Sequence, residues 1–132
     1  MAVWSQPLLS VRDVPASSRW YQQVLDAVSG HGGEDFEQLL VGGEIVLQLH
    51  RIDVADHHGL LADSQVPLGN GVAVWFEVSD FAAAVARIRT AGVRVETEPH
   101  ENPNARQHEI WLTDPDGYRV VVAGPSAYRP RS

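Results

Sequence analysis

The chain of 132 residues contains no cysteine. This absence excludes disulfides, thiolate catalysis and cysteine-ligated zinc or iron–sulfur centres. Because small secreted domains often depend on disulfides, it also favours a cytoplasmic protein. A chain of this length buries roughly two-thirds of its unfolded surface, so it can fold without a covalent or metal cross-link.

Long hydrophobic runs and an excess of basic residues are also missing. No apolar stretch approaches the ~20 residues of a membrane span, and the N-terminus lacks the basic and apolar segments of a signal peptide. The net charge of −7 argues against nucleic acid or an anionic membrane as a partner and favours cationic ligands. A hydrophobic content of 44% predicts a folded chain, apart from a loose tail at 125–132.

The first half of the chain reads as a strand, a helix and two further strands. Residues 6–11 form a strand-like run, and Asp13 after them is a favourable N-cap. An apolar stripe then recurs at helical spacing on Ser17, Trp20, Tyr21, Val24 and Leu25. Two strand-like runs follow at 36–41 and 44–50, and the Gly42-Gly43 pair between them is typical of a hairpin.

The second half repeats this order. Residues 72–78 read as a strand, and Asp80 is placed to cap a helix. That helix has its apolar stripe on Phe81, Ala84, Val85 and Ile88. Further strands are expected at 93–96, 109–113 and 118–123. An Asp-Pro-Asp-Gly turn at 114–117 joins the last two.

These matching halves indicate an internal repeat. Asp13 and Asp80 occupy equivalent strand-to-helix corners, half a chain length apart. We therefore predict an α+β fold in which two tandem modules curl their sheets around one small-molecule cavity. The expected organisation is a single domain at 1–124, made of module 1 at about 5–51, a connector at 52–70 and module 2 at about 71–124. A polar connector of this length is typical of a lid or a linker.

Alternation along the strands predicts a polar and aromatic face on each sheet. Apolar side chains at every second position face the helix, so the intervening side chains face away from it. On this opposite face we expect Gln6, Leu8, Ser10, Gln48, His50, Trp75, Glu77, Glu109, Trp111 and Arg119. A plain solvent face would be richer in lysine and would not carry two tryptophans, so the mixture favours a concave pocket. A dimer interface, which also enriches aromatics and arginine, is the alternative.

Two pairs of residues on this face have predicted roles. Trp75 and Trp111 are the strongest candidates for ligand contacts, because a flat indole stacks on a planar ring or a cation. Glu77 and Glu109 form an acid–base pair if they lie across the cavity from each other. Alternatively, Arg119 neutralises one of these carboxylates in a structural ion pair.

Four histidines outside this face are interpreted as exposed. Adjacent residues converge poorly on one metal, so His57 and His58 are expected to be a solvated pair in the connector. If the connector folds over the pocket, either imidazole can contact a ligand. His100, Glu101 and His108 flank residues 102–104 and are expected in an exposed polar loop. An approach of these residues to the rim of the pocket is the alternative.

The order and spacing of several short motifs resemble the vicinal oxygen chelate superfamily. The motifs are Val11-Arg12-Asp13, Arg19-Trp20-Tyr21, Val24-Leu25, Phe76-Glu77-Val78-Ser79-Asp80 and Asp114-Pro115-Asp116-Gly117-Tyr118. This superfamily contains glyoxalase I, extradiol dioxygenases, and bleomycin- and fosfomycin-resistance proteins. The resemblance covers about residues 5–124 and implies two βαβββ modules, usually in a homodimer.

The resemblance also implies where a metal would bind. Metal-dependent members of the superfamily use His, Gln or Glu ligands from the first, fourth, fifth and eighth strands. In this chain those positions fall on Gln6, Gln48, Ala73 and Val121. Divalent metals in such sites need carboxylate or imidazole donors, so we expect no metal and no cofactor here. A two-residue shift along a strand would bring in His50 or Glu77.

The function expected from the sequence is metal-independent binding of an aromatic or cationic small molecule. In this respect the chain is similar to the bleomycin-resistance branch. The predicted ligand-binding residues are Gln6, Gln48, His50, Trp75, Glu77, Glu109, Trp111 and Arg119. The alternatives are a divalent-metal-dependent lyase, isomerase or dioxygenase, a metal-free acid–base enzyme, and a structural dimer with a vestigial cavity.

Overall fold

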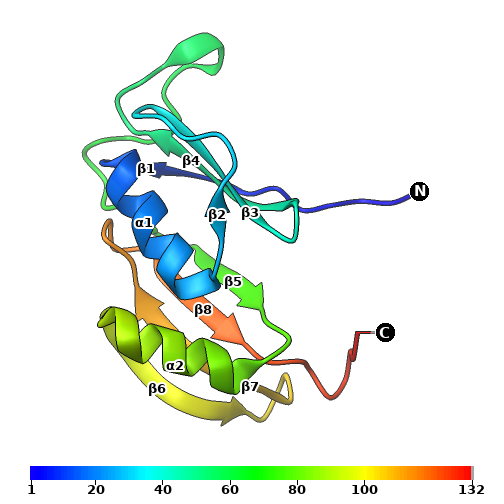
Figure 1. Cartoon of the computed structure of the whole chain (residues 1–132). Coiled ribbons are helices and arrows are strands. Elements are labelled where there is room, and N and C mark those ends of the chain that lie inside the picture. Colours follow the sequence, from blue (N-terminus) through cyan, green and yellow to red (C-terminus); the bar gives the residue numbers. More distant parts are fainter. Residues whose placement is uncertain (132) are drawn as a thin grey trace. The chain divides into compact units, whose positions relative to one another are not determined.

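The computed structural model describes residues 1–131 and contains two four-stranded sheets, each accompanied by one long helix (Figure 1). The chain divides into two compact units, Met1–Leu68 and Gly69–Ser132. Each unit has the strand–helix–strand order predicted from the repeat, which confirms the tandem α+β architecture. A cavity shared by the two modules stays a prediction. Within residues 1–131, no helix has the length and apolarity needed to cross a membrane.

The first unit has the strand order β1-β4-β3-β2. Strand β1 (Leu8–Val11) runs parallel to β4 (Glu44–Arg51), and β4 pairs antiparallel with β3 (Phe36–Val41). Strand β2 (Val28–Ser29) pairs with β3. The residue pattern did not predict it, although the βαβββ order implied by the resemblance includes a strand here. Its two exposed residues are too few to show an alternating pattern.

Helix α1 (Val14–Leu25) packs on β3 and β4 of this sheet. Its N-terminus is capped as predicted, because the Asp13 carboxylate accepts a hydrogen bond from the backbone N–H of Ala16 at 3.0 Å. Tyr21 and Val24 of the predicted apolar stripe are fully buried. The helix therefore covers the apolar face of the sheet and leaves the other face for polar groups.

The second unit has the equivalent order β5-β8-β7-β6. Strand β5 (Ala73–Glu77) runs parallel to β8 (Arg119–Ala123). Strand β7 (Gln107–Thr113) lies antiparallel between β8 and the edge strand β6 (Val95–Asn102). The β7–β8 hairpin is the one predicted from the Asp-Pro-Asp-Gly turn.

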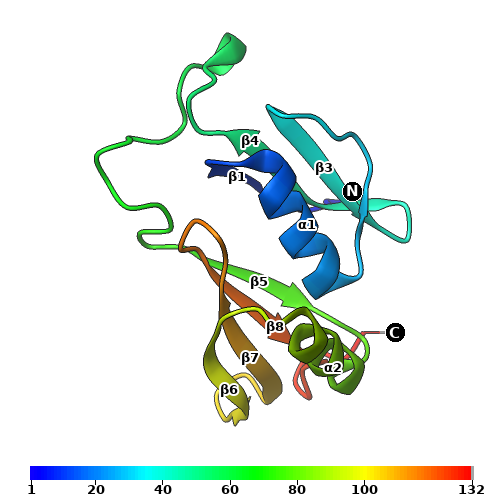
Figure 2. The same cartoon turned by 60° about the vertical axis from the view of Figure 1, so that its left-hand side comes forward.

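Helix α2 (Phe81–Ala91) covers one face of the second sheet, against β7 and β8 (Figure 2). The Asp80 carboxylate accepts from the backbone N–H of Ala83 at 3.0 Å, so this predicted cap also forms. Ala84 and Ile88 are buried. The opposite face of the sheet is thus the one that carries the predicted tryptophans.

Strand β6 extends beyond the predicted strand at 93–96 and reaches Asn102. The sequence pattern failed here because the segment is polar and contains Pro99. An edge strand tolerates proline, since one side of its backbone has no strand partner. Register irregularities on either side of Thr97 accompany the polar stretch. His100 therefore lies in β6 and His108 in β7, so the predicted loop is wrong for both, although both are exposed as predicted.

The tail after β8, expected to be loose, contacts the turn between β6 and β7 instead. The Ser126 hydroxyl donates to the carbonyl of Ala105 at 2.8 Å, and the Ala127 N–H donates to the carbonyl of Arg106 at 3.0 Å. The Arg106 guanidinium also lies 5.9 Å from the ring centre of Tyr128. These contacts hold the start of the tail against the second unit.

The turn at 114–117 closes the β7–β8 hairpin. Asp114 is only 4% exposed, and its Oδ1 accepts from the backbone N–H groups of Asp116 and Tyr118, each at 2.9 Å. Gly117 has φ +93°, which L side chains rarely adopt. Side chain and backbone together therefore hold the register of the two strands.

Asp114→Ala should lower the free energy of unfolding by about 1–3 kcal/mol, because two backbone N–H groups lose their acceptor. Urea denaturation followed by circular dichroism measures this loss. Asp114→Asn keeps an oxygen acceptor and should be less destabilised. Equal denaturation midpoints for the alanine variant and the wild type would contradict this role of Asp114.

Candidate functional site

On the face of the second sheet away from α2, two tryptophans flank a buried valine. The strand register places Trp75 on β5 and Trp111 on β7 on either side of Val121 on β8. The indole ring centres are 5.9 Å apart and the rings are nearly perpendicular, at 85°. Trp75 remains 42% exposed, whereas Val121 is fully buried. The structure thus brings the two predicted aromatic residues together.

A buried carboxylate lies beside this aromatic pair. Glu109 is 2% exposed and accepts a hydrogen bond from the Trp111 indole N–H at 2.8 Å. Its other oxygen accepts from the Asn102 side-chain amide at 3.2 Å, and the His100 Nε2 lies 3.5 Å from the first oxygen. These contacts orient both the carboxylate and the indole plane.

Arg119 lies over the Trp111 ring, with its guanidinium carbon 5.1 Å from the ring centre. It neutralises neither Glu77 nor Glu109, so the predicted structural ion pair is wrong. Its guanidinium binds Glu96 instead, with Nε–Oε1 at 3.0 Å and Nη2–Oε1 at 2.5 Å. The difference arises because β6, longer than expected, carries Glu96 next to the site. These hydrogen bonds from Arg119 hold the pKa of Glu96 below its ordinary value of 4.5.

The two predicted acid–base carboxylates are not in contact. Glu77 on β5 and Glu109 on β7 both pair with Ala123 on β8, which separates them by two strand spacings, or about 10 Å. Glu77 is instead bound by the guanidinium of Arg131 from the tail. A proton cannot pass directly between these two carboxylates in this arrangement.

A cavity of about 360 Å³ opens beside Trp111, within the size range of small-molecule sites. We call it the Trp111 cavity. It is lined by Thr97, His100, Asn102, Pro103, Glu109, Trp111 and Arg119. Three of the predicted ligand-binding residues line it, and Trp75 adjoins it through its ring contact with Trp111. Glu77 is not part of the lining.

The other three predicted ligand-binding residues belong to the first unit. The Gln48 side-chain amide donates to the backbone carbonyl of Gln6 at 3.1 Å. His50 follows on the same face of β4 but is only 4% exposed, and its Nε2 lies 3.0 Å from the carboxylate of Asp56. A single pocket that joins these residues to the second unit stays a prediction.

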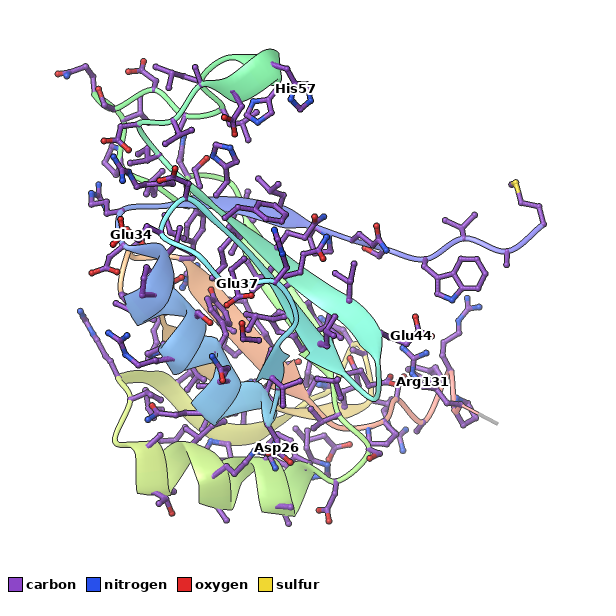
Figure 3. The ribbon with its side chains drawn as sticks, turned by 45° about the horizontal axis from the view of Figure 1, so that its top comes forward. Asp26, Glu34, Glu37, Glu44, His57 and Arg131 are labelled. Carbon is purple, nitrogen blue, oxygen red and sulfur yellow. The ribbon has the colours of Figure 1, made fainter. Side chains whose placement is uncertain are left out.

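The first unit also buries the carboxylate of Glu37, which is labelled in Figure 3. It accepts from the hydroxyl of Ser18 on α1 at 2.9 Å and from the hydroxyl of Ser29 on β2 at 2.8 Å. The backbone N–H of His31 is a further donor at 3.3 Å. These bonds tie α1 and β2 to β3, so Glu37 has a structural role.

Comparison with known proteins agrees with this architecture. The family model described as the Glyoxalase/Bleomycin resistance protein/Dioxygenase superfamily matches residues 5–122. The chain belongs to this superfamily. The resemblance inferred from the short motifs is therefore confirmed at the level of the superfamily. A comparison with curated proteins found no match.

Several solved structures are similar to this superfamily member, and their alignments cover nearly the whole chain. An integron cassette protein from V. cholerae is 19% identical with a TM-score of 0.72, and the match covers 96% of this chain and 97% of the other. Lactoylglutathione lyase from Agrobacterium tumefaciens is 19% identical with a TM-score of 0.68 and 94% coverage of both chains. The fosfomycin resistance protein FosX from Listeria monocytogenes is 14% identical with a TM-score of 0.69 and 97% coverage of both. At these identities the likeness establishes the fold alone.

The four positions at which metal-dependent superfamily members have ligands do not suit a metal in this chain. Gln48 directs its amide nitrogen to the carbonyl of Gln6. Ala73 and Val121 offer only a methyl and an isopropyl group. One amide oxygen from each glutamine is too weak a donor set for a divalent ion, and no chemical step is assigned to a metal at these positions.

Strand β6 supplies four residues near the site, and of these only His100 was considered in the sequence analysis, as a possible neighbour of the pocket rim. Glu96, Thr97, His100 and Asn102 approach the site only because the segment is a strand beside β7. The two-residue spacing of His100 and Asn102 was a usable signal, since it places them on one face of a strand. The pattern was not recognised because Pro99 interrupts the segment and because the register with β7 shifts between Thr97 and His100.

Replacing Arg119 with glutamine should raise the pKa of Glu96 toward its ordinary value, because the charged hydrogen bonds to the carboxylate are lost. In the wild type the Arg119–Glu96 ion pair stabilises the folded state fully at pH values above the ordinary pKa of Glu96. This stabilisation is lost as the pH falls through the lowered pKa that Glu96 has in the folded protein. Carboxyl ¹³C shifts followed by NMR during a pH titration measure the change.

Glu98 provides the internal control, since its pKa is lowered by Arg89 and should not move in Arg119→Gln. An unchanged pKa of Glu96 in the variant would contradict the Arg119–Glu96 pair.

Proposed function

We propose that this protein binds a planar aromatic cation in the Trp111 cavity and sequesters it without a metal and without chemical conversion. The observation that carries the proposal is the buried Glu109 carboxylate, which is hydrogen-bonded to the indole that lines the cavity. An aromatic surface joined to a fixed anionic group offers contacts for both parts of such a ligand.

The charge balance at the cavity favours a cationic ligand. The positive charge of Arg119 is matched by Glu96 at hydrogen-bonding distance. Glu109 has the half-exposed imidazole of His100 as its basic neighbour, at 3.5 Å. A carboxylate removed from water in this way interacts more strongly with an incoming cation than an exposed one does.

The aromatic pair supports recognition of a planar group. Trp75 keeps a large exposed area next to the cavity, and Trp111 is held in place by its hydrogen bond and by the guanidinium over its ring. A ligand that stacks here does not have to order a mobile side chain, which lowers the entropic cost of binding. The superfamily's description includes bleomycin resistance proteins beside glyoxalases and dioxygenases, so it is compatible with a binding role.

Proflavine, a planar aromatic cation, is a suitable probe for this proposal. Trp111→Ala should weaken proflavine binding at least tenfold, because the stacking surface is removed. Glu109→Gln should weaken it roughly tenfold, because the charge is lost while the shape is kept. Fluorescence titration of the dye measures both affinities, and naphthalene-2-sulfonate, a planar anion, should bind weakly to all variants.

Two substitutions outside the cavity are matched controls. Trp4→Ala removes an exposed indole of the first unit, and Glu101→Gln removes an exposed carboxylate of β6 that does not line the cavity. Both should bind proflavine like the wild type. Equal affinities for the cavity and control variants would overturn the proposal.

The competing functions predict different results in the same assay. Loss of proflavine binding on addition of EDTA would favour a metal-dependent lyase, isomerase or dioxygenase. If Trp75→Ala changes the oligomeric state in size-exclusion chromatography but not proflavine affinity, the tryptophan face is a dimer interface. The homodimer, the cytoplasmic location and a role in antibiotic resistance stay predictions.

A further inference from the structure

Three potential metal ligands meet where the connector begins, within the first unit. His50 comes from β4, and Asp56 and His58 come from the 3₁₀ helix η1 (Asp56–His58), which follows β4 in the connector (Figure 2). One nitrogen or oxygen atom from each residue lies within 4.8 Å of the others. The rings of His50 and His58 have centres 4.8 Å apart. His57 and His58 are both exposed, as predicted, but His58 also lies beside His50 and Asp56.

The hydrogen bonding of His50 leaves a ligand nitrogen facing a carboxylate. Its Nδ1 lies 2.9 Å from the carbonyl oxygen of Arg51, which can only accept, so this contact is a hydrogen bond in the tautomer that has its proton on Nδ1. The opposite nitrogen, Nε2, lies 3.0 Å from Oδ2 of Asp56. In a neutral imidazole this places one lone pair against another. A proton or a metal ion between the two atoms resolves the conflict.

His58 also has one ring nitrogen next to a backbone carbonyl oxygen. Its Nδ1 lies 2.5 Å from the carbonyl oxygen of Gly59, so this nitrogen also acts as a donor and Nε2 is left to bind. Metal-ligating histidines typically donate their second ring N–H to a carbonyl or a carboxylate, which fixes the tautomer and the ring orientation. Both imidazoles of this group show that arrangement.

The distances and charges suit a small transition-metal ion. Ligand atoms bound to one tetrahedral Zn²⁺ at ~2.0–2.1 Å lie about 3.3 Å from each other, close to the 3.0 Å between His50 and Asp56. His58 is exposed and can move toward them. Arg51, the neighbouring cation, is bound by Asp53 at 2.5 Å and by Asp35 at 3.2 Å, so it does not pair with Asp56.

We propose that His50, Asp56 and His58 bind one divalent transition-metal ion of the Zn²⁺, Co²⁺ or Ni²⁺ type. Two imidazoles and a carboxylate suit these ions, and three protein ligands leave a coordination position for water or a small ligand. The site is separate from the four ligand positions of metal-dependent superfamily members and from the Trp111 cavity. Its metal links the start of the connector to β4.

Titration of the untagged protein with Co²⁺ tests the proposal. The wild type should bind one ion per chain and develop the visible absorption of cobalt in a low-symmetry nitrogen and oxygen site, and Zn²⁺ should displace it. His58→Ala and Asp56→Asn should each weaken Co²⁺ binding by about tenfold or more. Both positions are exposed, so these variants should fold.

His57, labelled in Figure 3, is adjacent to His58 but is not one of the three ligands, so His57→Ala is the matched control. It should bind Co²⁺ like the wild type. Zn²⁺ should also raise the Tm of the wild type and of His57→Ala, but not that of His58→Ala, because a ligand that binds the native state stabilises it.

Two results would overturn the proposal. If the wild type develops no cobalt absorption and no Tm shift with Zn²⁺, the contact between His50 and Asp56 is a hydrogen bond and not part of a metal site. If His58→Ala binds Co²⁺ as tightly as the wild type, the ion is bound elsewhere. Proflavine binding at the Trp111 cavity should be unchanged by the metal, so failure of this proposal is distinguishable from failure of the proposed function.

Discussion

The position of β8 between β5 and β7 is the constraint on which the candidate site depends. Parallel pairing with β5 and antiparallel pairing with β7 bring Trp75 and Trp111 to either side of Val121. A one-residue slip in either ladder would turn one tryptophan toward α2. The buried Asp114 turn therefore matters for the site as well as for the hairpin, because it holds the register of β7 and β8.

The edge strand β6 converts this face into a cavity. Glu96 of this strand forms an ion pair with Arg119. His100 and Asn102 of the same strand contact the buried Glu109. The electrostatic character of the Trp111 cavity thus depends on a polar strand with little hydrophobic signal of its own.

The two halves share an architecture but differ in their chemistry. In the second unit the polar groups surround an indole pair. In the first unit the imidazole of His50 contacts the carboxylate of Asp56 in the connector. The duplication explains the matching strand orders and helix caps. It does not explain the functional groups.

The argument that a plain solvent face would be richer in lysine fails for this protein. The whole sequence contains no lysine, and its ten Lys and Arg residues are all arginine, so the lack of lysine on the tryptophan face carries no information.

The sequence by itself determined the elements with local signals: both helix caps, the hairpin turns, the repeat and the helix-facing side of β1, β4, β5, β7 and β8. These features depend on residues within a few positions of each other, where period and turn chemistry are decisive. Only the tertiary structure decided that Arg119 binds Glu96, that β6 supplies His100 and Asn102, and that His58 reaches His50. Such contacts depend on strand order and on the path of a polar connector, and neither is encoded in local periodicity.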